Sequence, residues 1–340
     1  MRLQPPKSRP KLPVTSLDEA TKAAAKYAKS SRSAATWRAY ESDWRIFQSW
    51  CLSVDKASLP ATPSTVALFL AAEAKERHAP ATLSRRLAAI RLMHLGAKYP
   101  SPHDALEVAE VLRGIRRAWK RPIAQKAPAV DEDIKRMVDA AAEQSLRGLR
   151  DRAILLLGFA GAFRRSELVA LDTDHLTRGK DGLSIRIASS KTDQLGEGQI
   201  VAIPRVPGSP YCPVQAVSDW LVAAEIQQGA VFRRFHRGDV VSKTRLSGQS
   251  VALLIKELAL KAGFAPGRYA GHSLRSGFLT SAARNRASIF KMADQSRHRS
   301  LDVLRTYVRE EERFEDHAAE GLLQASALPR RHKRASKRTG

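Results

Sequence analysis

Apolar side chains recur at steps of three and four residues through much of the first 120 residues, and this spacing constrains the fold more than any other feature. Trp37, Tyr40, Trp44 and Phe47 form one such stripe, which is typical of an amphipathic helix. We interpret the stripe as core rather than as a surface on which nucleic-acid bases stack. Because similar spacing continues beyond it, residues 16–119 are predicted to form an all-helical domain.

Three more helices are expected in this domain, the first opening at Pro63, the second capped by Thr82 and the third starting at Asp104. The last two carry arginines beside their apolar positions. Since the whole chain is strongly basic, we predict that these arginines contact DNA phosphates and grooves, although a solvated helix face would show the same pattern. They are Arg85, Arg86, Arg91, Arg113, Arg116 and Arg117.

Residues 120–129 hold two prolines and three basic residues and are predicted to be an interdomain linker. In the segment that follows, residues 130–325, both periodicities occur. Residues 149–159 are an apolar helix by this pattern, and residues 183–187 alternate as a half-buried strand does, with 200–203 as the partner strand. Further helices are expected from Asp131 or Asp133, over 212–227 and over 248–262. The predicted fold is mainly α, a helical N-terminal domain followed by a mixed α/β domain with a small antiparallel sheet.

The charge balance points to a polyanionic partner. The 340 residues include 58 Lys and Arg against 34 Asp and Glu, a formal net charge of +24. On a globular chain such an excess favours a role with nucleic acid. Residues 1–15 and 326–340 are predicted to be a flexible basic arm and a basic disordered tail.

Cysteine content and hydropathy exclude several classes of protein. Cys51 and Cys212 are the only cysteines, too few for a disulfide framework or a zinc module. Two free thiols suit a reducing compartment, so a cytoplasmic protein is expected. No apolar run approaches the ~20 residues needed to cross a membrane, and no membrane partner is expected.

Five short stretches carry the residue types needed to attack a phosphodiester. Such an attack requires cations on the non-bridging oxygens and an acid for the leaving oxygen. Arginine suits the first task, because its planar fork meets phosphate oxygens in pairs and stays charged. These groups, gathered around one tyrosine, predict attack without a metal, so no cofactor and no metal site are expected. The candidates are Arg164, Lys191, His272, Arg275, His298 and Tyr307.

The order and spacing of these residues resemble the tyrosine recombinase (phage integrase) family over nearly the whole chain. Residues 164–168, Arg-Arg-Ser-Glu-Leu, are similar to the family motif of arginine, any residue, serine, glutamate and leucine. Residues 272–275, His-Ser-Leu-Arg, match the family's His-x-x-Arg box. His298 precedes Tyr307 by nine residues, which is the family spacing.

The resemblance implies a role for each candidate. Arg164 and Arg275 would clamp the scissile phosphate, whereas Arg165 would point about 100° away from Arg164 on a helix. Glu167 would orient Arg164, although a surface ion pair has the same spacing. The other implied roles are proton transfer for His272, protonation of the departing 5′ oxygen for Lys191, binding of a non-bridging oxygen for His298, and nucleophilic attack to give a 3′-phosphotyrosine for Tyr307.

Two stretches depart from the family pattern. Arg297 stands where the family often has glycine before the histidine, and residues 161–163, Gly-Ala-Phe, stand where it often has Thr-Gly-Leu. Both are interpreted as flanking positions that remove no functional group. A degenerate, inactive member of the family is therefore not expected.

The activity implied by the resemblance is site-specific recombination of double-stranded DNA at inverted repeats, through a Holliday junction, by a homotetramer on two sites. An apolar stripe from Phe314 to Leu323 would dock in a neighbouring subunit or pack on its own domain. A type IB topoisomerase shares the same residue set, and a non-enzymatic basic DNA-binding protein would share the charge. The small helical domain and the C-terminal stripe favour the recombinase.

Overall fold

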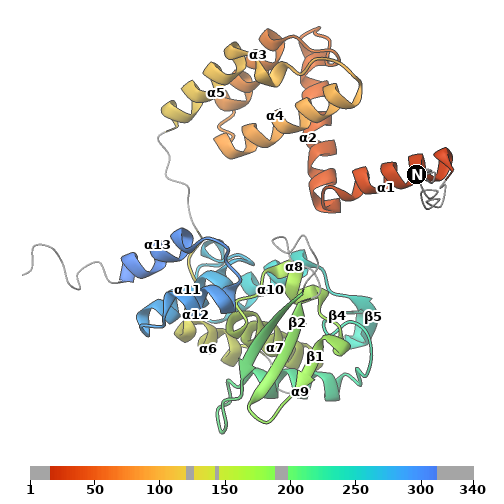
Figure 1. Ribbon diagram of the computed structural model, residues 1–340. Coiled ribbons are helices and arrows are strands. Elements are labelled where there is room, and N and C mark those ends of the chain that lie inside the picture. The colour runs from red at the N-terminus through yellow and green to blue at the C-terminus, as the bar shows by residue number, and fades with distance from the viewer. Residues whose placement is uncertain (1–15, 120–125, 142–144, 188–197, 312–340) are drawn as a thin grey trace, which may run out of the picture. The chain divides into compact units, whose positions relative to one another are not determined.

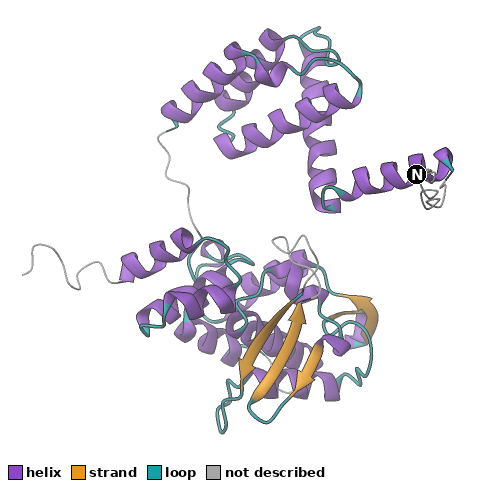
Figure 2. Ribbon diagram, in the orientation of Figure 1, coloured by secondary structure: helices purple, strands orange, loops and turns teal. Residues whose placement is uncertain are grey.

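The chain forms two compact units, residues 1–123 and 124–340. Both consist mainly of helices, and the second also contains small antiparallel sheets (Figure 2), so the predicted fold class is confirmed. No helix in the described ranges is both long enough and apolar enough to cross a bilayer. The computed structural model describes residues 16–119, 126–141, 145–187 and 198–311 (Figure 1).

The first unit is a helical bundle in which several helices begin where the sequence supplies a cap. Ser16, Ser33 and Thr62 each accept a hydrogen bond from the first turn of the next helix. Each bond satisfies an amide that has no partner within its own helix. The helices are α1 (Leu17–Ser30), α2 (Ala34–Ser53), α3 (Pro63–Lys75), α4 (Pro80–Gly96) and α5 (Leu106–Ala118).

The prediction that Thr82 caps a helix is wrong. Helix α4 begins two residues earlier, at Pro80, because proline has no amide hydrogen to satisfy and its fixed φ suits the first helical position. The other two starts agree with the structure more closely. Helix α3 opens at Pro63, and α5 follows a short 3-10 turn that contains Asp104.

The aromatic stripe of α2 enters the core only in part. Phe47 is fully buried and packs against Phe69 with ring centroids 5.0 Å apart, and Trp44 packs against the same cluster. Trp37 and Tyr40, nearer the start of the helix, are half-buried. The interpretation as core therefore holds for the second half of the stripe.

Helix α7 (Leu146–Ala160) is the central helix of the second unit. It is buried along most of its length, as the sequence predicted, and α6, α9 and α11 pack against it (Figure 1). The other helices of the unit are α6 (Asp131–Asp139), α8 (Arg165–Ala170), α9 (Pro213–Ala223), α10 (Gly248–Lys261), α11 (Ser273–Arg284), α12 (Ile289–Ser296) and α13 (Leu301–Glu311).

A three-stranded antiparallel sheet completes this unit, with β2 (Gly182–Ile187) between β1 (Leu176–Arg178) and β3 (Gln199–Pro204). Alternate side chains of β2 are buried, and the strand pairs with β3, so both predictions for these segments are confirmed. A second sheet, β4 (Arg233–Phe235) with β5 (Val241–Arg245), was not predicted, because neither strand has an apolar alternation.

Helix α11 passes close to the segment that precedes α6. The amide of Ala129 donates to the carbonyl of Ser273 at 2.9 Å. A Cβ on Gly277 would stand 1.7 Å from the carbonyl oxygen of Ala129, so only glycine fits at this crossing. The contact fixes the helix that begins beside His272 and carries Arg275.

We expect Gly277→Ala to lower the free energy of unfolding of the second unit by about 1–3 kcal/mol, because the backbone must move to admit the methyl group. Urea unfolding followed by circular dichroism measures the change. Gly248→Ala is the matched control, since a Cβ there meets only the Cβ of Arg165 at 3.7 Å, an ordinary contact. Equal midpoints for the two variants would contradict the close approach.

Candidate active site

A tight turn after α7 supplies the frame of the site. Gly161 caps the helix, and a Cβ there would lie 2.1 Å from the ring of Phe163, which is buried. Ala162 adopts a left-handed backbone with φ of 45°. The turn presents the carbonyls of residues 161 and 162 to two arginines from other segments.

Arg164 follows this turn and precedes α8 rather than lying within it. Its amide donates to Glu167 Oε2 at 2.9 Å and its Nη1 donates to Oε1 at 2.5 Å. The predicted contact between the two residues is therefore present, but it arises at the helix cap and not on a shared helix face. Arg165 lies apart from it, with its Nη1 3.5 Å from the carbonyl of Gly248.

Arg275, on α11, is almost completely buried, with 1 % of its surface exposed. Its Nη1 donates to the carbonyl of Ala162 at 2.8 Å, and its Nη2 lies 3.3 Å from the ring nitrogens of His298. Burial, followed by the positive charges of Arg164 and Arg297, lowers the pKa of Arg275 to about 9. That value is above neutrality, so the guanidinium stays charged.

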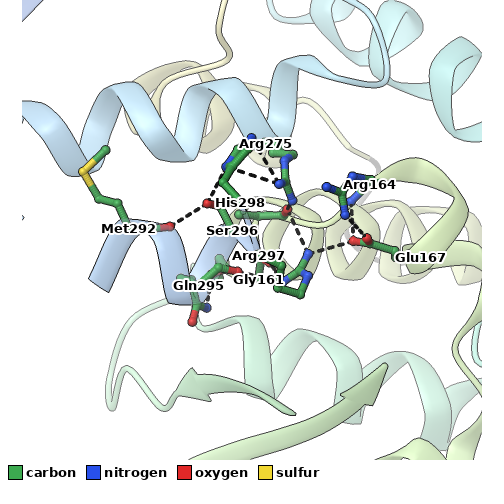
Figure 3. Close-up of polar contacts among 11 residues, drawn as sticks. Gly161, Arg164, Glu167, Arg275, Met292, Gln295, Ser296, Arg297 and His298 are labelled. Atoms are coloured by element: carbon green, nitrogen blue, oxygen red, sulfur yellow. Dashed lines mark hydrogen bonds and ion pairs between the residues drawn. The ribbon is translucent and has the colours of Figure 1, made fainter. Parts of the chain in front are cut away.

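His298 is held by a serine at the end of α12 (Figure 3). The hydroxyl of Ser296 lies 2.6 Å from the Met292 carbonyl and 2.7 Å from His298 Nδ1. Since a carbonyl can only accept, the serine hydrogen goes to Met292, and we assign the proton of this pair to Nδ1. Burial, followed by the charges of Arg275 and Arg164, lowers the pKa of His298 to about 4.

Tyr307, on α13, and His272, at the start of α11, line one cleft of about 1080 Å³. Ser276 and Thr280 lie along its wall. The lining also includes three basic residues, namely Lys126, Arg268 and Arg284. Their positive charges suit a phosphate backbone.

The electrostatics of this cleft depend on arginines that lie beside it. Burial, followed by the charges of Arg275 and Arg164, lowers the pKa of His272, although the ring keeps contact with solvent. Tyr307 lies near enough to Arg275 for a coulombic interaction that raises the pKa of the arginine.

The structure thus brings five of the six candidate residues into one region, while Lys191 lies outside the described residues. The sequence analysis did not identify two residues that support this region, Ser296 beside His298 and Arg297 beside Glu167. Ser296 carried no signal. Arg297 did carry one, a departure from the family's glycine, but it was interpreted as a flanking change. Its side chain is 2 % exposed and bonds to Glu167 (Figure 3).

Relatives with matching sequences are recombinases by name. Residues 130–313 match the phage integrase family. The chain is 38% identical over 289 residues to the integrase/recombinase xerD homolog of Selenomonas ruminantium, which covers 83% of this chain and 84% of that protein. It is 30% identical over 309 residues to a tyrosine recombinase of Synechococcus elongatus, with 86% and 89% covered. The chain belongs to the phage integrase family.

Solved structures share the integrase fold at low identity. The Tn1549 transposon integrase in complex with transposon right end DNA gives a TM-score of 0.59 at 12% identity, covering 86% of this chain and 95% of that chain. A lambda integrase dimer bound to a COC′ core site gives 0.57 at 13% identity, covering 87% and 78%. At such identities the similarity establishes the fold alone.

The six arginines predicted to contact DNA differ in placement within the helical unit. Arg86 is buried, with 6 % exposed, and forms ion pairs with Glu73 and Asp43, so it faces the interior of the bundle. Arg85 is half exposed but binds Asp43 at 2.7 Å. Arg116 donates to Ser84 at 3.1 Å. Arg116 is nevertheless exposed, as are Arg91, Arg113 and Arg117.

One group of possible metal ligands lies in the described part of the chain, away from the cleft. Oxygen and nitrogen atoms of Asp172, Asp174 and His175 lie within 4.8 Å of one another. Asp172 already binds Arg245 at 2.6 Å, and His175 Nδ1 accepts the amide of Asp172. These contacts indicate that the three residues stabilise the local structure of the chain.

A histidine whose pKa is lowered by folding weakens the fold as pH falls, because only the unfolded chain takes up the proton. For His298 this range runs from its ordinary value of 6.5 down to about 4. We expect His298→Gln to flatten the loss of stability over that range, measured as the urea midpoint at several pH values. The facing charges of Arg164, Arg275 and Arg297 remain, and His272 keeps part of the slope. An unchanged slope would contradict a neutral His298.

Proposed function

We propose that this chain is a site-specific DNA recombinase that cleaves and rejoins DNA through a 3′-phosphotyrosine. The observation that carries the proposal is the convergence of Arg164, Arg275, His272 and His298 beside the cleft that Tyr307 lines. Membership of the phage integrase family supports it. The cytoplasm is the proposed location, because a reducing compartment that contains DNA suits the two free cysteines.

The two arginines act as a clamp on the scissile phosphate. Glu167 and the turn carbonyl of Ala162 hold them from behind, so each retains donors for the non-bridging oxygens. A fork that is fixed before the phosphate arrives does not have to reorganise during the reaction. His298 adds a further donor once the phosphate charge has favoured its protonated form.

Cleavage is a transesterification in which one phosphorus–oxygen bond replaces another. The Tyr307 oxygen attacks phosphorus, its proton passes to a base, and the bond to the 5′ oxygen breaks. His272 takes part in proton transfer at the cleft, and Lys191 protonates the leaving oxygen. Because the phosphotyrosine conserves the bond energy, the 5′ hydroxyl of another strand can reverse the step without a cofactor.

The proposed partner is double-stranded DNA that carries inverted repeats. Two protomers bind each site, two sites assemble in a homotetramer, and exchange passes through a Holliday junction. The segment from Phe314 to Leu323, which lies outside the described residues, is proposed to dock in a neighbouring subunit. Solved structures with this fold include a lambda integrase dimer bound to a COC′ core site and the Tn1549 transposon integrase in complex with transposon right end DNA.

Arg91, Arg113 and Arg117 are the proposed phosphate contacts of the helical unit, since their side chains are exposed, whereas the exposed Arg85 and Arg116 already bind Asp43 and Ser84. We expect Arg113→Ala with Arg117→Ala to weaken DNA binding for every sequence and to reduce the salt dependence by about one unit of slope per lost phosphate contact. Fluorescence anisotropy over a salt series measures both. An unchanged slope would remove these arginines from the interface.

Arg86→Ala is the comparison for that experiment. It removes the buried partner of Glu73, so we expect a loss of about 3 kcal/mol of stability and an unchanged salt slope. The two outcomes separate an arginine that binds DNA from one that supports the bundle. A reduced slope for Arg86→Ala with full stability would reverse the assignment.

Tyr307→Phe tests the proposed chemistry. We expect the wild-type protein to form a covalent adduct with nicked suicide duplexes tiled from DNA that flanks the gene, in EDTA, and the variant to bind DNA without an adduct. Denaturing gels detect the adduct. Tyr269→Phe is the matched control, because Tyr269 is buried and its hydroxyl donates to Asp133 at 3.1 Å.

A second assay separates recombination from topoisomerase activity. Supercoiled plasmids with and without the cleaved repeat are incubated with the protein and then analysed for joined recombinants. Recombinants that require the repeat support the proposal. Relaxation of both plasmids with no recombinants would instead indicate a type IB topoisomerase.

A further inference from the structure

Arg297 occupies a position that does not favour a large side chain. It ends α12 in the left-handed region, with φ of 59° and ψ of 43°, where glycine has no steric cost and other residues do. Yet its side chain turns inward and is 2 % exposed. A strained backbone and a buried charge at one residue require compensating contacts.

The guanidinium of Arg297 has such contacts on both terminal nitrogens (Figure 3). Its Nη1 donates to the carbonyls of Gly161 at 3.0 Å and Gln295 at 2.7 Å. Its Nη2 donates to the carbonyl of Ala162 at 3.1 Å and to Glu167 Oε2 at 2.7 Å. The group also lies over the ring of Phe163, 5.0 Å from its centroid. One side chain thereby joins the end of α12, the turn after α7 and helix α8.

Two of these contacts lie directly behind the proposed phosphate clamp. Glu167 shares its carboxylate between Arg297 and Arg164, and the Ala162 carbonyl is shared between Arg297 and Arg275. Both terminal nitrogens of Arg297 already donate to two protein acceptors each. Arg297 therefore reaches both clamp arginines through shared acceptors and has no terminal donor left for the phosphate.

We propose that Arg297 is a positioning residue, which locks Glu167 and the turn carbonyls so that Arg164 and Arg275 are held ready for the phosphate. The inference rests on the proposed function. Arg297 is then not a flanking change, because its side chain supports Glu167 and the turn carbonyls, which a glycine at this position could not do.

The ionisation of Glu167 supports this assignment. Burial raises the pKa of its carboxyl, but the charge of Arg297 and the hydrogen bonds from Arg164 and Arg297 outweigh burial and lower it. The nearby groups are Arg164 at the start of its own helix, Arg297 from α12 and Arg275 from α11. Without Arg297 the pKa of Glu167 rises. As the pH falls, Glu167 then becomes protonated at a higher pH and stops holding Arg164.

The test measures single-turnover cleavage of a nicked suicide duplex at saturating DNA, together with DNA affinity, for wild type and Arg297→Gln. We expect the rate to fall by roughly 10- to 100-fold, as for other losses of alignment, while affinity changes little because contacts along the whole site determine it. The acid limb of the rate profile should move to higher pH. Arg297→Lys keeps the charge but not the fork, so it should restore that limb and only part of the rate.

Two more variants separate positioning from simple structural support. Glu167→Gln with Arg297→Gln should cleave no more slowly than the slower single variant, because coupled residues are not additive. Arg245→Gln is the matched control, since Arg245 also binds two backbone carbonyls and a carboxylate, those of Val169, Leu171 and Asp172. It should lower stability and leave the cleavage rate unchanged.

The outcomes distinguish this inference from the function beneath it. A wild-type adduct with an unchanged rate in Arg297→Gln, or a rate loss matched by Arg245→Gln, overturns the positioning role alone. Additive effects of the two site variants overturn it as well. Absence of any wild-type adduct overturns the proposed function and this inference together.

Discussion

Mutual repulsion among closely spaced arginines is the constraint around which this site is built. Arg275 and Arg297 are buried and Arg164 is partly buried, so water screens their charges poorly. Burial lowers the pKa of Arg275 and of Arg297, and the charge of Arg164 lowers both further. Glu167 is the carboxylate that binds two of the three, and the carbonyl of Ala162 serves the third. The cluster therefore keeps an excess of positive charge beside the cleft, and a bound phosphate would neutralise it.

The backbone of the second unit holds these positively charged side chains close together. The turn after α7 aims two carbonyls at the arginines, and the crossing of α11 at Gly277 fixes the helix that carries Arg275. Ser296 orients the ring of His298. Polar groups that are held before the substrate arrives stabilise developing charge without reorganisation, so the packing of the unit and its proposed chemistry depend on the same contacts.

Local patterns predicted much of the fold, and their failures have physical causes. The buried α7 and the pairing of β2 with β3 followed from periodicity, which depends on near neighbours. The prediction that Arg86 contacts DNA failed because it was based on the charge of the residue and not on its position in the helix. Residues 83, 86 and 90 share one helix face, so Arg86 lies on the side of Leu83 and Ile90, and its partner Glu73 comes from another helix.

The identity of the reactive groups, their order along the chain, the helical and strand periods, and the charge that points to nucleic acid can all be read from the sequence. How the arginines are shared between acceptors depends instead on the tertiary structure. Glu167 and Arg297 are 130 residues apart, and no period links them. Whether the residue before His298 is a flanking change or a buried support depends on which backbone carbonyls the fold places around it, and that is a property of packing.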